Sequence, residues 1–141
     1  LINGPNLNNL GSRDESQYGS TTLDEIIKEL KEKSDKFNTK IISFQSNHEG
    51  EIVDFIQKTS KSSDGVIINA GALSQVGYSI LDALIDSKLP YIEVHISNIY
   101  SREDYRKKSI TSEAMDGIIC GFGTNSYILA IEAISKLIYK K

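Results

Sequence analysis

Short apolar runs alternate with longer segments of helical periodicity along this chain of 141 residues. The runs predict five strands, which end at Ile2 and then span residues 41–44, 66–68, 91–94 and 118–120. Continuous runs rich in Val and Ile are typical of parallel strands that are buried on both faces. We expect the first strand to begin before Leu1, because only two apolar residues precede the turn at Asn3.

Four segments place apolar residues on one helical face, and a short polar helix is expected over residues 103–107. Thr22 followed by Glu25 has the pattern of a capping box, which predicts where the first helix begins. The apolar faces are Leu23, Ile26, Ile27 and Leu30; Ile52, Val53 and Ile56; Ile80, Leu81, Leu84 and Ile85; and Ile128, Leu129, Ile131, Ile134, Leu137 and Ile138. This alternation predicts one α/β domain over residues 1–141. Its doubly wound, five-stranded parallel sheet should have the order 2-1-3-4-5 of flavodoxin-like folds.

Composition and charge exclude several classes of protein. The net charge of −3 provides no overall basic field, so we expect neither nucleic acid nor an anionic membrane as a partner. No apolar run approaches the roughly 20 residues of a membrane span. The single cysteine, Cys120, cannot form an intramolecular disulfide and favours a reducing compartment such as the cytoplasm. One cysteine and two histidines cannot supply four ligands to a structural zinc ion, so no metal is expected.

Asn, Gly, Ser and His follow the predicted strands, in the segments 3–6, 45–47, 69–72, 95–98 and 121–125. Ligands of open α/β sheets bind beyond the carboxyl ends of the strands, so these five loops together indicate a site. Ordinary turns are the alternative for any single loop, since Gly and Asn tolerate positive φ. The first loop, 4–20, is long, lacks helical periodicity and carries Arg13 and Tyr18. Residues of about 8–19 are therefore expected to form a lid, the alternative being a mobile surface loop.

Several common chemistries do not fit the chain. No P-loop lysine follows Gly4 and Gly11, and Ser126 replaces the third glycine of a dinucleotide fingerprint. There is also no Gly-x-Ser-x-Gly elbow. Cys120 is expected in the core, and His48 in a turn. Tyr18, Arg13, His95 and a group of amides remain, a set that suits proton transfer on a neutral or anionic organic substrate.

These residues resemble the motifs of one enzyme family. Asn3-Gly-Pro-Asn-Leu-Asn, Leu10-Gly-Ser-Arg-Asp and Tyr18-Gly are similar to the opening signature of type II 3-dehydroquinate dehydratase. The second loop, Phe44-Gln-Ser-Asn-His-Glu-Gly-Glu, also resembles that family. So do Asn69-Ala-Gly-Ala with Asp82-Ala-Leu, Glu93-Val-His-Ile-Ser-Asn with Arg102 and Arg106, and Gly121-Phe-Gly with Tyr127. The similarity runs over almost the whole chain in the family's order.

The resemblance implies a hydro-lyase without a cofactor, which converts 3-dehydroquinate to 3-dehydroshikimate by anti elimination through an enolate. It makes Tyr18 the base, with Arg13 favouring its ionised form, and His95 the general acid, with Glu93 or a neighbour orienting the ring. Asn6 would stabilise the enolate. The implied substrate-binding residues are Asn69, Gln75, Asp82, Ile96, Ser97 and Arg106. Arg106 is chosen over Arg102 by motif register alone. The resemblance also implies a homododecamer built from trimers, in which Asp82 reaches a neighbour's site.

The chain departs from the family at three positions. Gln75 stands where the family usually has histidine, Ala70 where it has proline, and Gly77 where it has serine. Glutamine can still bond a hydroxyl but cannot carry charge, so the Michaelis complex is expected to be weaker. Two other readings stay open: a flavodoxin-like module that binds a small anion or flavin phosphate, and a structural oligomer with a vestigial site. Loss of turnover in Tyr18→Phe would separate the enzyme from both.

Overall fold

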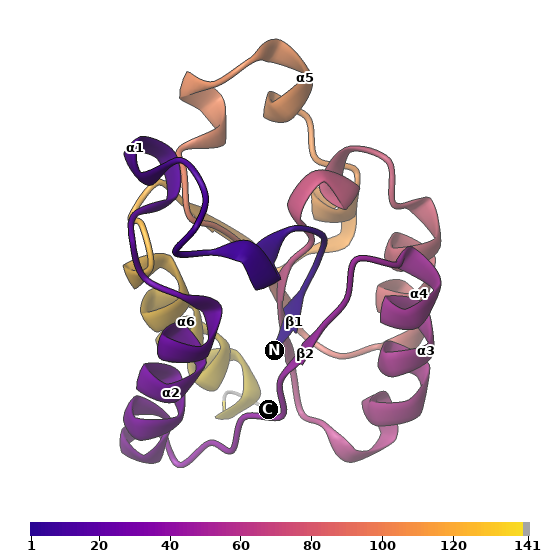
Figure 1. Ribbon diagram of the computed structural model, residues 1–141. Helices are drawn as coiled ribbons and strands as arrows, with labels where there is room; N and C mark the ends of the chain where they lie inside the picture. Colours follow the sequence, from indigo (N-terminus) through magenta and orange to yellow (C-terminus); the bar gives the residue numbers. More distant parts are fainter. Residues whose placement is uncertain (140–141) are drawn as a thin grey trace.

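Helices cover both faces of a five-stranded parallel sheet in the computed structural model, which describes residues 1–139 (Figure 1). The order β2-β1-β3-β4-β5 confirms the predicted flavodoxin-like topology. α2 and α6 lie on one face, and α3 and α4 on the other (Figure 1). The strands are β1 (Ile2–Asn3), β2 (Phe44–Gln45), β3 (Val66–Asn69), β4 (Tyr91–His95) and β5 (Gly117–Cys120).

The predicted helices are all present, and several one-turn elements join them to the strands. The α-helices are α1 (Glu15–Tyr18), α2 (Leu23–Ser34), α3 (Glu49–Thr59), α4 (Tyr78–Ser87), α5 (Asp104–Lys107) and α6 (Asn125–Tyr139). The 3-10 turns are η1 (Leu7–Asn9), η2 (Asp35–Phe37), η3 (Ser60–Ser62), η4 (Gly71–Gln75), η5 (Ile99–Ser101) and η6 (Thr111–Ala114). α2 begins with the predicted capping box, in which the Glu25 amide donates to Thr22 Oγ1 and the Thr22 amide donates to the Glu25 carboxylate. None of the helices within residues 1–139 is long and apolar enough to cross a membrane.

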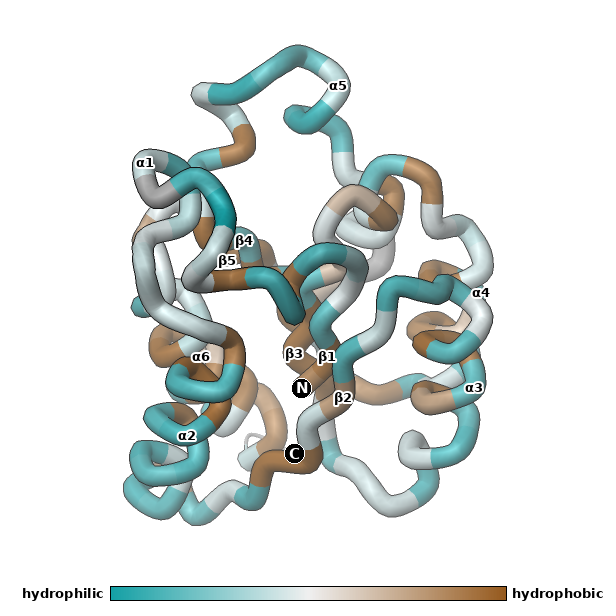
Figure 2. Tube along the Cα trace, in the orientation of Figure 1, coloured by the Kyte–Doolittle hydropathy of each residue, from teal (hydrophilic) through white to brown (hydrophobic). Residues whose placement is uncertain are grey.

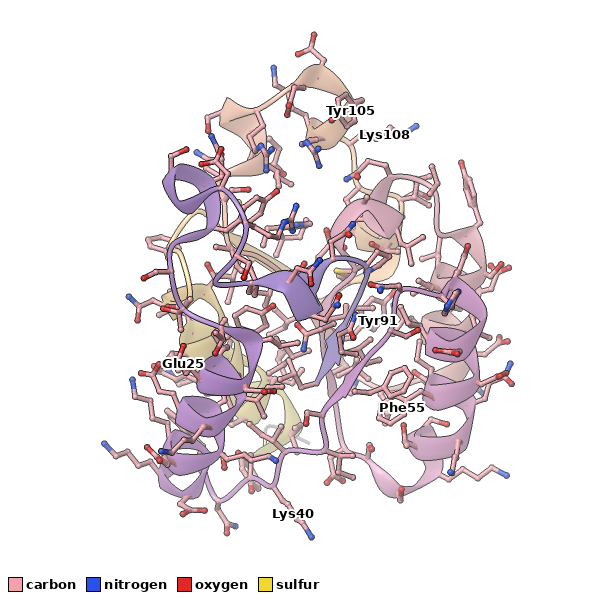
Figure 3. All side chains as sticks on the ribbon, viewed as in Figure 1. Glu25, Lys40, Phe55, Tyr91, Tyr105 and Lys108 are labelled. Atoms are coloured by element: carbon pink, nitrogen blue, oxygen red, sulfur yellow. The ribbon has the colours of Figure 1, made fainter. Side chains whose placement is uncertain are left out.

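Apolar side chains form two cores, one on each face of the sheet. Consecutive residues of β3 point to opposite sides, so Ile67 belongs to the core under α2 and α6, and Ile68 to the core under α3 and α4. Burial on both faces explains why β3 is an apolar run up to Asn69, and the tube at β3 is largely brown in Figure 2. Phe55 of α3, labelled in Figure 3, stacks on Phe44 of β2 with ring centroids 4.4 Å apart.

The register of the sheet brings the polar ends of the strands to one edge. Asn3 pairs with Gln45 on one side and with Asn69 on the other. His95 pairs with Cys120 on the edge strand. Because all five strands are parallel, the loops that follow these residues rise from the same edge.

Three expectations about local structure were wrong. The second strand is Phe44–Gln45 rather than 41–44, because its only partner, β1, is Ile2–Asn3. The loop 4–20 is not structureless, since it contains η1 and the single turn α1, both too short to show helical periodicity. Cys120 is half-buried rather than in the core, because β5 is an edge strand.

Gly4 lies where the loop after β1 passes closest to the loop after β3. Its amide donates to the Asn69 carbonyl at 2.8 Å, and an added Cβ would come within 2.3 Å of the Ala70 carbonyl oxygen. We expect Gly4→Ala to lower the free energy of unfolding by about 3 kcal/mol, because two backbone segments must separate. Urea unfolding measures this loss.

The control for this change is Gly50→Ala in α3, where an added Cβ meets nothing within 4 Å. That variant should be neutral or gain up to about 1 kcal/mol, as alanine does in helices. A loss of less than about 1 kcal/mol in Gly4→Ala would show that the two loops can separate without cost.

Candidate active site

A cavity of about 130 Å³ lies beyond the carboxyl ends of β1, β3 and β4. The segments that line it follow these three strands and include η4, part of the 8–19 segment and the stretch from η5 to α5. Its lining contains Asn6, Arg13, Tyr18, Asn69, Gln75, His95, Ile96, Ser97, Arg102 and Arg106. Nine of the ten side chains predicted for the site are therefore brought together, and Arg102 is added to them.

Tyr18 lies between two arginines. The Arg102 Nη1 group donates to the Tyr18 hydroxyl at 2.9 Å, and the Arg13 guanidinium carbon lies 3.9 Å from the centroid of the same ring. The hydrogen bond that Arg102 donates to Tyr18 is the main cause that raises the pKa of Arg102, so this guanidinium stays charged. The Tyr18 hydroxyl therefore faces one guanidinium and its ring faces another.

Arg102 is the cavity residue that the sequence analysis passed over, because Arg106 was chosen instead of it by motif register alone. The structure gives the two arginines different surroundings. Arg102 reaches Tyr18 and, at 3.4 Å, the Ser97 hydroxyl, whereas Arg106 Nε donates to Glu103 at 2.9 Å. Glu103 also lies 3.5 Å from Arg102 and so bridges the two. No sequence signal would have assigned Arg102 to Tyr18, since 84 residues separate them.

His95 contacts Glu93, one of the alternatives that the resemblance left open for orienting its ring. Its Nε2 atom lies 2.5 Å from Glu93 Oε1. Glu93 is fully buried, and its second oxygen accepts hydrogen bonds from Thr111 at 2.6 Å and Ser109 at 3.0 Å. These contacts satisfy both carboxylate oxygens and fix the ring orientation, which leaves the other ring nitrogen for the cavity.

Asn6 enters the cavity from a strained turn. Its φ of 66° lies in the left-handed region, which asparagine tolerates better than most residues. Its backbone N–H donates to Asn47 Oδ1 at 2.9 Å, and Gln45 Nε2 donates to the same oxygen at 3.2 Å. The loop after β2 therefore supports Asn6 from outside the cavity, instead of lining it as predicted.

Gln75, which replaces the family's histidine, lies in η4 on the wall of the cavity. Its Nε2 donates to Ser74 Oγ at 2.5 Å, and Ser74 Oγ donates to the Gly71 carbonyl at 2.8 Å. The glutamine oxygen is thus left as the acceptor available to a ligand.

Positive charge dominates the cavity although the chain is acidic overall. Arg13, Arg102 and Arg106 line it, and none of the described lining residues is Asp or Glu. Residues 1–139 contain no group of three or more His, Cys, Asp and Glu side chains that could hold a metal ion. Such a cavity suits a small organic anion.

Two of the predicted elements lie elsewhere. Asp82 is exposed on α4 and does not line the cavity of its own chain. The loop 121–125 lines a separate, shallower depression next to the 8–19 segment, together with Ser97 and Asn98. The expectation that all five loops line one site is therefore wrong, and the loops after β1, β3 and β4 form the cavity.

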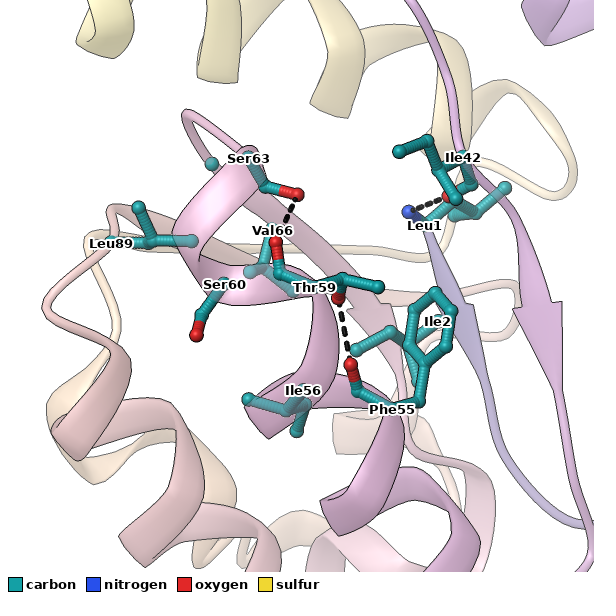
Figure 4. A pocket seen from close by; sticks show the side chains of 11 residues that line it. Leu1, Ile2, Ile42, Phe55, Ile56, Thr59, Ser60, Ser63, Val66 and Leu89 are labelled. Atoms are coloured by element: carbon teal, nitrogen blue, oxygen red, sulfur yellow. Dashed lines mark hydrogen bonds between the residues drawn. The ribbon is translucent and has the colours of Figure 1, made fainter.

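A second, apolar cavity lies at the opposite edge of the sheet, between β1 and α3 (Figure 4). Its hydroxyl groups are already used within the chain: Thr59 donates to the Phe55 carbonyl at 2.7 Å, and Ser63 to the Thr59 carbonyl at 3.0 Å. None of the described residues that line it has a side chain that could transfer a proton at neutral pH. This apolar cavity is therefore not a candidate for proton-transfer chemistry.

The fold and this cavity define an α/β protein with an arginine-rich cavity at the carboxyl edge of a parallel sheet, and comparison with known proteins specifies the family. Residues 1–135 match the family described as Dehydroquinase class II. The chain therefore belongs to the class II dehydroquinase family of hydro-lyases.

Curated relatives and solved structures agree with this assignment. The 3-dehydroquinate dehydratase of Prochlorococcus marinus (strain MIT 9301) is 54% identical over 134 residues, 95% of this chain and 91% of that protein. The one from Caldicellulosiruptor saccharolyticus is 47% identical over 139 residues, 98% of this chain and 96% of that protein. The crystal structure of type II dehydroquinase from Butyrivibrio crossotus DSM 2876 matches with a TM-score of 0.91 and 41% identity, covering 94% of this chain and 93% of the other.

Proposed function

We propose that this protein dehydrates 3-dehydroquinate to 3-dehydroshikimate, a step of the shikimate pathway to aromatic amino acids. The observation that carries this proposal is the Tyr18 hydroxyl, which accepts a hydrogen bond from Arg102 in a cavity whose described lining residues include three arginines and no carboxylate. The names of the curated relatives support the same reaction. The lone cysteine is in keeping with a cytoplasmic location.

The proposed reaction moves one proton at each of two residues. Ionised Tyr18 removes a proton from C2, next to the ketone, and the electron pair enters the carbonyl to form an enolate. Asn6 stabilises the charge on that oxygen, directly or through a water molecule. The enolate then collapses, the C1–oxygen bond breaks, and His95 gives its proton to the departing hydroxyl, which leaves as water. The two groups act from opposite faces of the substrate ring, so the elimination is anti.

The remaining lining residues bind the substrate in this proposal. Asn69 and the backbone N–H groups of Ile96 and Ser97 hold the carboxylate, while Gln75 and Arg106 meet the ring hydroxyls. The 8–19 segment closes as a lid, and closure brings Arg13 and Tyr18 onto the substrate and excludes water.

We also propose a homo-oligomer, built from trimers into a dodecamer. Asp82 is exposed on α4 and outside its own cavity, so it is available to a neighbouring subunit. Val76, Tyr78 and Ile85 are large exposed apolar side chains near it on the same part of the chain. Exposed apolar groups that cluster in this way favour a protein–protein contact. Light scattering of the purified protein gives the mass; a stable monomer would contradict the proposal.

Ultraviolet absorbance tests the reaction directly, because dehydration creates a conjugated enone. Purified protein mixed with 3-dehydroquinate should give a rise in absorbance whose rate is proportional to protein concentration. Binding of 3-dehydroquinate without any such rise would instead support a flavodoxin-like binding module.

Gln75 provides a prediction about substrate affinity. We expect Gln75→His to lower KM by about 3–10-fold with kcat changed less than twofold, because a charged donor binds a hydroxyl more strongly than an amide. Steady-state kinetics measures both constants. Gln57→His, on the exposed side of α3 and outside the cavity, is the matched control and should leave KM unchanged. An unchanged KM in Gln75→His would show that residue 75 does not contact the substrate.

A further inference from the structure

Tyr127, in the first turn of α6, carries a buried hydroxyl that no step of the proposed reaction uses. Its side chain is fully buried and does not line the cavity. The hydroxyl accepts a hydrogen bond from Asn69 Nδ2 at 2.8 Å and donates one to Asn3 Oδ1 at 2.7 Å. Residues from β1, β3 and α6 are therefore joined in one chain of hydrogen bonds, which ends at a residue of the cavity wall.

The contacts of Asn69 determine which atoms donate and which accept in this chain of hydrogen bonds. The Gly71 amide donates to Asn69 Oδ1 at 3.2 Å. If the Asn69 amide were flipped, its NH2 group would face the Gly71 N–H, and two donors would oppose each other. Asn69 Nδ2 must therefore point to Tyr127, and the Tyr127 hydroxyl must pass its own hydrogen to Asn3. Burial raises the pKa of Tyr127, so the phenol keeps this hydrogen.

The same direction leaves one buried donor unused. With Asn3 Oδ1 turned to Tyr127, Asn3 Nδ2 has no hydrogen-bond partner among the described residues, although it is fully buried. Unpaired buried donors are rare and usually have a cause elsewhere in the structure. Here the cause is the orientation of Asn69, which makes Tyr127 donate to Asn3 Oδ1 and so turns Asn3 Nδ2 away from the hydroxyl. Tyr127 accepts one of the two hydrogens of Asn69 Nδ2, and the other remains for a ligand of the cavity that Asn69 lines.

We propose that Tyr127 and Asn3 are positioning residues, which keep the Asn69 amide turned so that an N–H group faces the cavity and meets the substrate carboxylate. This proposal rests on the proposed function and deepens it. The Gly71 amide holds the oxygen of Asn69 at 3.2 Å, and Tyr127 holds its NH2 group at 2.8 Å. Without the Tyr127 contact the longer Gly71 bond is the remaining restraint among the described contacts, and an amide that turned would present its oxygen to the carboxylate, where two acceptors repel. The three residues thus determine the polarity of the carboxylate subsite, although only Asn69 touches it.

Tyr127→Phe removes a single oxygen and leaves the packing of the ring in place. We expect KM for 3-dehydroquinate to rise about 10-fold, with kcat within twofold, because carboxylate binding is used equally in the ground and transition states. Asn3→Ala, which removes the far end of the chain of hydrogen bonds, should give a KM between those of Tyr127→Phe and the wild type. It serves as the second variant if Tyr127→Phe does not fold.

Tyr91→Phe is the matched control. Tyr91 is a second buried tyrosine, on β4, and its hydroxyl has no hydrogen-bond partner among the described residues (Figure 3). It does not line the cavity, so KM should stay at the wild-type value. Unfolding midpoints of all variants are measured in parallel, so that a general loss of stability is recognised.

Dissociation constants for 3-dehydroquinate, measured by calorimetry in the Tyr18→Phe background, separate this proposal from the proposed function. A roughly 10-fold weaker binding caused by Tyr127→Phe supports the positioning role, even if the wild type has no turnover. Equal KM and equal binding in Tyr127→Phe and the wild type overturn it, while leaving the dehydratase activity intact. A wild-type protein that does not bind 3-dehydroquinate overturns both.

Discussion

Replacing Tyr18 by phenylalanine is expected to lower kcat by about 10³-fold, within the range that proton transfer by a positioned side chain contributes. The substitution removes the hydroxyl that accepts the Arg102 hydrogen bond at 2.9 Å. It keeps the aromatic ring, over which Arg13 lies at 3.9 Å. The 8–19 segment should therefore keep its place against the cavity, and the dissociation constant for 3-dehydroquinate should change less than about threefold. The enone absorbance assay and calorimetry measure the two quantities.

Tyr105→Phe is the matched control for this loss. Tyr105 is an exposed tyrosine of α5 whose ring lies 4.8 Å from the Arg106 guanidinium carbon, and it does not line the cavity (Figure 3). Tyr105→Phe thus also removes a phenol oxygen beside an arginine, but away from the proposed catalytic residues. Turnover should therefore remain at the wild-type level. If Tyr18→Phe kept more than a tenth of wild-type kcat, another group would have to be the base.

Replacing His95 by glutamine is expected to lower kcat by about 10²–10³-fold, because an amide cannot transfer a proton at neutral pH. Glutamine is chosen over alanine because its NH2 group can still donate to Glu93. Removing the partner of a buried carboxylate would otherwise destabilise the protein by several kcal/mol. The Glu93 contacts with Thr111 and Ser109 remain in either case. Comparing kcat with the unfolding midpoint separates the chemical role of the ring from its structural role.

The chain contains only one other histidine, and this provides the control. His48 precedes α3 as an exposed N-cap residue and lies outside the cavity. His48→Gln should leave kcat unchanged. A His95→Gln variant with kcat within fivefold of the wild type would mean that the leaving hydroxyl takes its proton from elsewhere, for example from a water molecule.

The two arginines that contact Tyr18 come from different segments of the chain. Arg102 belongs to the η5–α5 stretch, which Glu103 ties to Arg106, whereas Arg13 lies on the same segment as Tyr18. Tyr18 therefore has both of its arginine contacts only where these two segments meet. In the proposed mechanism, closure of the 8–19 segment places the Tyr18 hydroxyl next to Arg102 and onto the substrate.

The sequence by itself determined the order of the strands, the four long helices and the start of α2. Each of these depends on local signals: apolar runs in Val66–Asn69 and Tyr91–His95, helical periodicity, and the Thr22–Glu25 capping box. Parallel strands joined by right-handed crossovers admit few arrangements, so the topology followed from the alternation of elements. The motifs that resemble the family were also local, which is why nine of the ten predicted site residues line one cavity.

Tertiary structure alone decided which side chains meet across long separations in the chain. The contact of Arg102 with Tyr18 spans 84 residues, and the bond from Tyr127 to Asn3 spans 124. Neither contact produces a periodic pattern in the sequence, because each depends on where two separate elements pack against the sheet. The short β2 and the half-buried Cys120 have the same explanation. How far a strand pairs and how deeply it is buried depend on its neighbours in the sheet, so neither can be predicted from the residues of the strand alone.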